Sequence, residues 1–230
     1  MKKSMPLLAR TLALASFAIA AAAALPQPAQ LPAHPEMLVS TQWLSEHLKD
    51  PGIVVLHVAK DKADYDKGHI PGAHFLQISR FIDEHVGAMG ELPSVEQLKG
   101  AFAEAGVSNN SRVILYTTAW FPLAARAYYT LDFLGHDNTA LLDGSYDQWT
   151  LEKRPVSTET PALSRGNFTP HPRPAVRALL EEAKAATAAS SQVAIVDARP
   201  LKRYHGGHRA GAVNVYWLGT LVSKENLVFR

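Results

Sequence analysis

Apolar residues in the first two thirds of the chain follow two spacings, one typical of buried strands and the other of amphipathic helices. The predicted elements, in chain order, are a helix at 40–48, a strand at 53–58, a helix at 94–105, a strand at 113–116, a helix at 122–133 and a strand at 139–142. Strands that alternate with helices favour a parallel sheet covered by helices on both faces. The pattern therefore predicts an α/β fold.

Polar residues at the predicted helix ends support these boundaries. Ser40 is a suitable N-cap for the first helix, and Ser94 with Gln97 fits a capping box at the start of the second. Pro122 suits the first turn of the third helix, and Gly135 suits its C-terminal stop. Each boundary is thus predicted from local chemistry as well as from hydrophobic spacing.

The chain also contains an internal repeat at an offset of 139 residues. The segment Tyr65-Asp-Lys-Gly-His69-Ile-Pro-Gly-Ala73 aligns with Tyr204-His-Gly-Gly-His208-Arg-Ala-Gly-Ala212. A β-rich run precedes each copy, at 54–58 and at 193–197. Self-similarity at this period predicts that one structural unit has been duplicated.

The repeat and the proline content divide the chain into two modules. We expect the first module to span residues 37–157 and the second to span residues 175–230. A proline-rich stretch at 158–174 is predicted to link them.

The N-terminal residues have the pattern of an export signal. A charged start, an apolar run and small residues up to Ala24 predict a secretory signal peptide at 1–24. Four prolines at 25–36 predict an extended tether. The apolar run from Thr11 to Leu25 is shorter than the roughly 18 residues that a membrane span needs. We therefore expect a periplasmic or secreted protein that has no membrane segment after cleavage.

Charge and cysteine content narrow the possible functions. Loss of Lys2, Lys3 and Arg10 with the signal would lower the formal net charge from +2 to −1, and no basic run remains downstream. Nucleic acid is therefore not an expected partner. The chain contains no cysteine, which excludes disulfides and any thiol nucleophile within these 230 residues.

Two motifs resemble those of a known family. The segment Tyr65-x-x-x-His69-Ile-Pro-Gly-Ala73 and the segment Leu142-Asp-Gly-Ser-Tyr-Asp-Gln-Trp149 resemble the rhodanese-like sulfurtransferases, specifically the two-domain thiosulfate and 3-mercaptopyruvate sulfurtransferases. The resemblance implies tandem rhodanese-like domains, a small sulfur donor, and a thiol or cyanide acceptor. It implies no cofactor and no metal. Sulfane sulfur would pass through a cysteine persulfide in the second domain.

In the first module, Thr117 occupies the position at which the family places cysteine. A threonine hydroxyl does not ionise near neutral pH and cannot form a persulfide. Pro122 lacks an N–H group, and Trp120 and Phe121 are bulky, which disfavours an anion-binding cradle. We interpret this loop as inactive, with no catalytic residue. An alternative is that Trp120 and Phe121 form one wall of a cleft shared with the second module.

In the second module, the corresponding loop falls outside the sequence. His69 and Thr117 are 48 residues apart, so the equivalent loop would lie near position 256, beyond Arg230. We therefore expect a second domain represented only by its N-terminal part, which would leave an unpaired sheet edge. A third possible function is a phosphatase of related fold, but such an enzyme would also need the cysteine loop, which this sequence lacks.

Arginine and histidine side chains supply the remaining candidate contacts. The resemblance assigns donor binding to Arg203, with Arg199 as the alternative, since a guanidinium suits an oxyanion or carboxylate. Either arginine could instead be a surface charge or pair with Asp197. His205 and His208 have weak chelate spacing and no third ligand nearby, so we expect no metal. A non-catalytic module that binds a partner or small anion is the competing function.

Overall fold

The computed structural model describes residues 35–83, 90–118, 120–162, 164–188, 192–222 and 227–229, all within one compact unit that spans His34–Arg230. The predicted signal peptide at 1–24 and nearly all of the predicted tether lie outside the described residues. In the described part of the chain, no helix is long and apolar enough to cross a bilayer.

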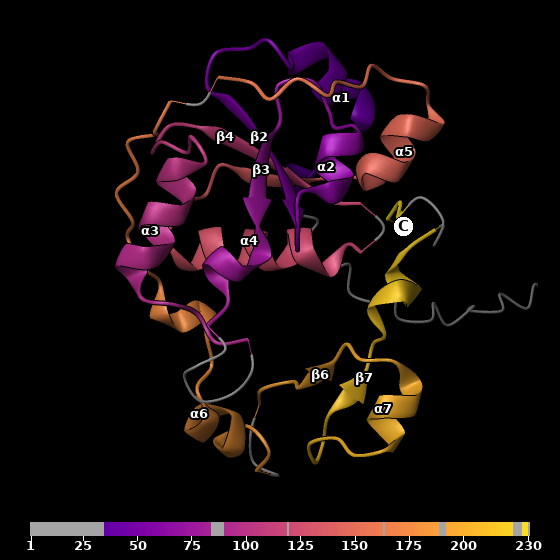
Figure 1. Ribbon diagram of the computed structural model, residues 1–230. Coiled ribbons are helices and arrows are strands. Elements are labelled where there is room, and N and C mark those ends of the chain that lie inside the picture. Colours follow the sequence, from indigo (N-terminus) through magenta and orange to yellow (C-terminus); the bar gives the residue numbers. More distant parts are fainter. Residues whose placement is uncertain are drawn as a thin grey trace, which may run out of the picture. The chain divides into compact units, whose positions relative to one another are not determined.

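Five strands form a parallel sheet in the first module, and two short strands pair in the second (Figure 1). The order in the larger sheet is β1-β5-β4-β2-β3, and every neighbouring pair is parallel. The strands are β1 (Leu38–Val39), β2 (Ile53–Ala59), β3 (His74–Gln77), β4 (Arg112–Tyr116), β5 (Thr139–Leu142), β6 (Val196–Asp197) and β7 (Val213–Asn214). The predicted α/β fold is confirmed.

Helices connect the strands and cover the larger sheet. The α-helices are α1 (Thr41–His47), α2 (Ala63–Lys67), α3 (Val95–Glu104), α4 (Pro122–Phe133), α5 (Ser145–Leu151), α6 (Leu180–Ala185) and α7 (Leu201–His205). Short 3-10 helices are η1 (Pro35–Met37), η2 (Ile78–Phe81), η3 (Pro174–Val176) and η4 (Trp217–Thr220).

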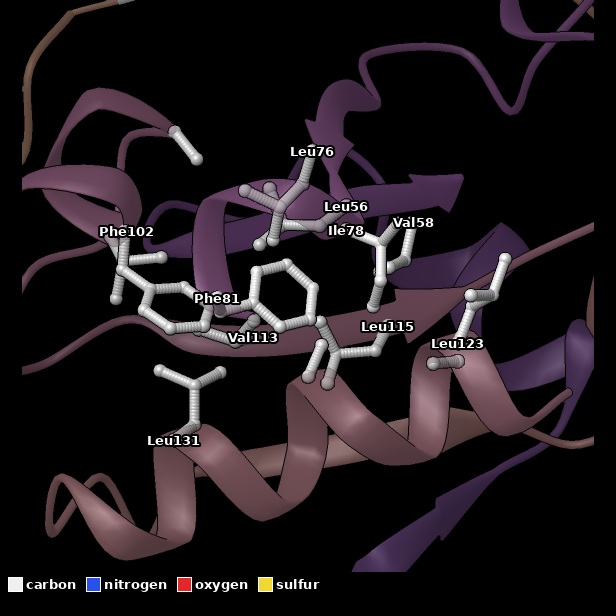
Figure 2. Packing of buried hydrophobic residues seen from close by; sticks show 14 of the residues in the cluster. Leu56, Val58, Leu76, Ile78, Phe81, Phe102, Val113, Leu115, Leu123 and Leu131 are labelled. Carbon is white, nitrogen blue, oxygen red and sulfur yellow. The ribbon is translucent and has the colours of Figure 1, made fainter. Parts of the chain in front are cut away.

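Two apolar cores sandwich the sheet, because successive strand residues point to opposite faces. On one face, Leu56 of β2 and Leu115 of β4 pack against α3 and α4, as Figure 2 shows. On the other face, Val55 and Ile114 pack with residues of α1 and α5. The interior residues Val113–Tyr116 of β4 are fully buried, as expected for the middle of a parallel sheet.

The predicted helix ends are confirmed by their hydrogen bonds. Ser40 Oγ accepts from the backbone N–H of Trp43 at 3.0 Å. Ser94 and Gln97 form both hydrogen bonds of the capping box. Helix α4 starts at Pro122 and ends before Gly135, whose φ of +80° is left-handed. Local sequence therefore sets where these helices begin and end.

The segment predicted as a linker is bonded to the first module along much of its length. The N–H of Gly166 donates to Ala103 O at 2.8 Å, and the N–H of Asn109 donates to Asn167 O at 3.1 Å. Phe168 is buried in the core beside the ring of His136. Residues 164–173 are therefore part of the first module's packing.

The two copies of the repeat have the same internal contacts, which supports the duplication. Tyr65 Oη donates to Ala73 O at 2.8 Å, and the equivalent Tyr204 Oη donates to Ala212 O at 2.7 Å. The ring of His69 stacks on Tyr65 at 3.8 Å, and that of His208 stacks on Tyr204 at 3.9 Å. Both Tyr–His turns follow a strand and a short helix.

The last described residues pack on the first module. Leu221 and Leu227 are buried in the core that contains α3 and α4. The N–H of Phe229 donates to the Asp143 carboxylate at 2.8 Å. The N-terminal part of the second module, in contrast, leaves Val193, Val196 and other apolar side chains exposed.

The close approach at Gly166 gives a testable prediction. A Cβ at this position would lie 2.0 Å from Val107 O, which is backbone and cannot move aside cheaply. We expect Gly166→Ala to lower the free energy of unfolding by about 2 kcal/mol or more, measured by urea denaturation. Gly100→Ala is the control, since it lies in α3 with no atom within 4 Å of the added methyl. It should stabilise the helix by up to about 1 kcal/mol. Equal stabilities for the two variants would contradict the packing of residues 164–173.

Candidate functional site

The loop after β4 lies where open α/β sheets bind ligands. Chain order reverses between β2 and β4: β2 leads outward to β3, and β4 leads the other way to β5. Crevices at the carboxyl ends of strands on either side of such a reversal are the usual binding sites of these folds. His57 is near the end of β2 and Thr117 directly follows β4, so both stand at this position.

Thr117 is fully buried and its backbone is held by the neighbouring loop. Its N–H donates to Ser145 Oγ at 2.8 Å, and the same hydroxyl donates to Thr117 O at 2.6 Å. The N–H of Tyr146 also donates to Thr117 O at 3.2 Å. Ser145 adopts a left-handed φ of 53° directly after Gly144, which turns its hydroxyl toward Thr117. The residue at the cysteine position is therefore closed off from solvent.

Thr118, the next residue, contacts a buried histidine. Its Oγ1 lies 3.2 Å from Nε2 of His57, whose ring stacks on Tyr116 with centroids 4.7 Å apart. Burial lowers the pKa of His57 to about 4, so the ring is neutral at physiological pH. Nδ1 of His57 has no hydrogen-bond partner among the described residues. The site therefore offers no imidazolium to stabilise an anion.

The two aromatic residues of the loop have different surroundings. Phe121 is buried and meets the ring of Phe229 edge-on at 4.7 Å. Trp120 is 49% exposed, and Lys60 Nζ lies 5.6 Å from the centre of its ring. Trp120 lines a cavity built from first-module residues, whereas Phe121 contacts the end of the second module. The predicted cleft wall is thus divided between two separate environments.

In the second module, Asp197 and Arg199 form a closely bonded pair. Nε of Arg199 lies 2.9 Å and 3.0 Å from the two carboxylate oxygens, and its NH2 group also donates to Gly207 O at 2.8 Å. Hydrogen bonds from Arg199 hold the pKa of Asp197 at about 2. Both residues line a 640 Å³ cavity with His208 and Arg209. Of the two readings for Arg199, pairing with Asp197 is the one observed.

The surroundings of Arg203 differ from those of Arg199. It is exposed on α7, it does not line the cavity, and it forms no ion pair with another described residue. Of the two candidate arginines, only Arg199 lines this cavity.

Strand register shows that His57 and Asp197 are equivalent positions. His57 pairs with Phe75 across β2 and β3, and Asp197 pairs with Asn214 across β6 and β7. Phe75 and Asn214 are related by the repeat offset of 139 residues. A neutral histidine in the first module thus replaces a carboxylate in the second.

The histidines of the repeat, His69 and His208, contact backbone carbonyl groups. Nδ1 of His69 lies 2.8 Å from Tyr65 O, and Nδ1 of His208 lies 2.9 Å from Tyr204 O. Each histidine therefore contacts the backbone carbonyl of the tyrosine at the start of its own repeat segment. The described residues contain no cluster of three or more histidine, cysteine, aspartate or glutamate side chains that could hold a metal ion.

Sequence reasoning did not identify Ser145 as part of the loop. Its contact with Thr117 joins residues 28 positions apart and depends on how β4 and β5 pair. The one available signal was Gly144 before it, which permits the tight turn at the end of β5.

The burial of His57 predicts a pH effect on stability. Because its folded pKa of about 4 lies below its ordinary value of 6.5, neutral His57 favours folding above pH 6.5, and this contribution is lost as the pH falls toward 4. The loss would be at most about 3 kcal/mol. His57→Phe keeps the ring contact with Tyr116 and removes the titration, so its unfolding free energy should change less over this range.

Urea denaturation from pH 4 to 7 would measure this difference. The matched control is His171→Phe, a change at an exposed histidine, which should leave the wild-type pH profile intact. If the profiles of the wild type and His57→Phe ran parallel, His57 would not be the group that titrates.

Comparisons with known proteins agree with this architecture. The model of the family described as "Rhodanese-like domain" matches residues 40–152, which contain the Thr117 loop. "Sulfur carrier protein TtuD" of Thermus thermophilus is 32% identical over 222 residues, covering 85% of this chain and 76% of that protein. A "Putative thiosulfate sulfurtransferase" of Mycolicibacterium smegmatis is 31% identical over 220 residues, covering 85% of this chain and 77% of that protein.

A solved structure extends the comparison to the fold. The crystal structure of SseA from Escherichia coli, described under 3-mercaptopyruvate sulfotransferases, has a TM-score of 0.70 and 26% identity, covering 83% of this chain and 78% of that one. These shares exceed the length that the family model spans, so the similarity includes part of the second module. The chain belongs to the rhodanese-like sulfurtransferase family.

Proposed function

We propose that this sequence is part of a sulfurtransferase that moves sulfane sulfur from thiosulfate or 3-mercaptopyruvate to a thiol or cyanide. A cysteine outside these 230 residues would carry the persulfide, in a loop of the second module that corresponds to the Thr117 loop. With thiosulfate, the thiolate would attack the outer sulfur and sulfite would leave. The acceptor would then attack the persulfide and restore the thiolate.

The closure of the Thr117 loop is the single observation that supports an inactive first module and sulfur chemistry in the second. A persulfide site needs an exposed sulfur surrounded by N–H donors that stabilise its charge. Thr117 is fully buried, and its N–H is already bonded to Ser145 Oγ. The first module therefore has a structural role in this proposal and takes no part in the sulfur chemistry.

Charge in the second module supports Arg203 as the contact for the donor's anionic group. The guanidinium of Arg199 is neutralised by Asp197 and fixed to Gly207 O. Arg203 has no carboxylate partner among the described residues, so its charge is available to a ligand. Arg199 would then position Asp197 and the turn at Gly207.

Export remains part of the proposal, on the pattern of residues 1–24. A periplasmic or secreted protein would use a small donor from outside the cytoplasm. The chain contains no cysteine, so nothing in it depends on a disulfide. This composition fits a periplasmic or extracellular protein whether or not that protein is catalytic.

The competing function is a non-catalytic rhodanese-like module that binds a partner or small anion. The absence of any thiol in the 230 residues favours it for the chain used alone. The gene sequence past codon 230 distinguishes the two proposals. The catalytic proposal expects it to encode a cysteine-containing loop near position 256. An in-frame stop directly after Arg230 would overturn the catalytic proposal and leave the binding module.

The closure of the loop predicts that a thiol placed there stays silent. We expect Thr117→Cys to form no thiocyanate from thiosulfate and cyanide, because its sulfur would be buried and its N–H committed to Ser145. Its reaction with Ellman's reagent should be about a hundredfold slower than that of an exposed thiol, since it requires local opening.

Thr150→Cys provides the exposed control, because Thr150 is a solvent-accessible residue of α5. Both variants should react at the same rate in denaturant. Rapid labelling of the native Thr117→Cys protein, or thiocyanate production by it, would show that the loop opens and would contradict the inactive assignment.

A further inference from the structure

The first module contains a large cavity that the proposed sulfur chemistry does not use. It has a volume of about 970 Å³ and lies beyond the carboxyl ends of β2 and β3, bordered by α3 and the start of α4. Thr117, Arg199 and Arg203 do not line it. Lys60 follows β2 and Trp120 follows β4, so the cavity opens at the reversal of strand order, where α/β sheets bind ligands.

One wall of the cavity is apolar and rigid. Ile78 and Leu123 belong to the buried core and also line the cavity, and Figure 2 shows both side chains together with other residues of that core. Trp120 adds an indole ring that is 49% exposed, although the neighbouring Phe121 is buried. A large aromatic surface left in water beside two core residues suits an apolar ligand body.

A lysine ammonium stands beside this wall. Lys60 Nζ lies 5.6 Å from the centre of the Trp120 ring. Gln77 Nε2 donates to Lys60 O at 3.0 Å, which fixes the backbone from which the lysine extends. Among the described residues, Lys60 has no carboxylate partner. Its positive charge is therefore available to a ligand that contacts the indole.

Two other polar residues of the cavity, Glu104 and Gln97, have partners for their acceptor oxygens. Glu104 accepts from Arg80 at 2.5 Å and from Arg165 at 3.1 Å, and these hydrogen bonds lower its pKa. Gln97 Oε1 accepts from the N–H and the hydroxyl of Ser94, whereas its Nε2 donates to no described residue. The acceptor oxygens of Glu104 and Gln97 are therefore occupied, while donors at Lys60 and Gln97 remain. The carboxylate of Asp83 also lines the cavity.

We propose that this cavity is a binding site for a small organic anion with one carboxylate and an apolar, preferably aromatic, body. The carboxylate pairs with Lys60, and the apolar body packs against Trp120, Ile78 and Leu123. The site is distinct from the residues assigned to sulfur transfer, because Thr117, Arg199 and Arg203 do not line it, although Trp120 belongs to the inactive Thr117 loop. It gives the first module a ligand of its own.

The test uses the 230-residue chain and three probes: phenylacetate, its neutral isostere phenylacetamide, and acetate. Binding is followed by the NMR signal of the Trp120 indole N–H, assigned with a Trp120→Phe variant. We expect phenylacetate to shift this signal saturably, and phenylacetamide and acetate to bind more weakly. Lys60→Met keeps the apolar stem and removes the charge, so phenylacetate should bind about fivefold more weakly, as for a partly exposed ion pair.

Lys49→Met is the matched control, since Lys49 is exposed and does not line the cavity. It should leave phenylacetate binding unchanged, and Lys60→Met should leave phenylacetamide binding unchanged. The proposal is overturned if phenylacetate causes no saturable shift, if Lys60→Met binds it as tightly as the wild type, or if either acetate or phenylacetamide binds as well as phenylacetate. None of these results depends on whether the protein transfers sulfur.

Discussion

The burial of β4 on both faces is the constraint on which the first module depends. Residues Val113–Tyr116 have no access to water, so the polar backbone where the strand ends must be satisfied within the protein. The reciprocal hydrogen bonds between Thr117 and Ser145 do this, joining the end of β4 to the end of β5. The same contacts that complete the sheet therefore close the first-module position that corresponds to the cysteine loop of the second domain.

The two modules show which part of the repeat is structural and which part is free to change. The Tyr–His turn has the same hydrogen bonds and stacking in both copies, although only its tyrosine, one glycine, its histidine and the final Gly-Ala are shared. At the end of the preceding strand, however, the first module has a neutral His57 where the second module has the ionised Asp197. Asp197 fixes an arginine, whereas His57 fixes only a threonine hydroxyl. Charge is thus retained only in the second module.

Much of the fold could be predicted from the sequence because its signals are local. The helix at 122–133 was located to the residue, and the capping box at Ser94 marks the start of α3. In the second module, β6 is only Val196–Asp197, shorter than the β-rich run at 193–197 suggests. In the first module, the longer strands β2, β4 and β5 have neighbours on both sides, whereas β6 has only β7. The path of residues 164–173 was likewise not predictable, since it is determined by distant partners such as Val107.

The site illustrates the same limit in a more specific way. Sequence placed Thr117 correctly after β4, yet nothing local indicates that Ser145 closes over it or that Lys60 and Trp120 come together. The first outcome follows from the pairing of β4 with β5, and the second follows from the order β4-β2 at the centre of the sheet, which sets the ends of these two strands side by side. Closing the loop consumes its inward polar groups, and the residue that remains outside is Trp120. This exposed indole and Lys60 are the groups on which the anion site proposed for the first module depends.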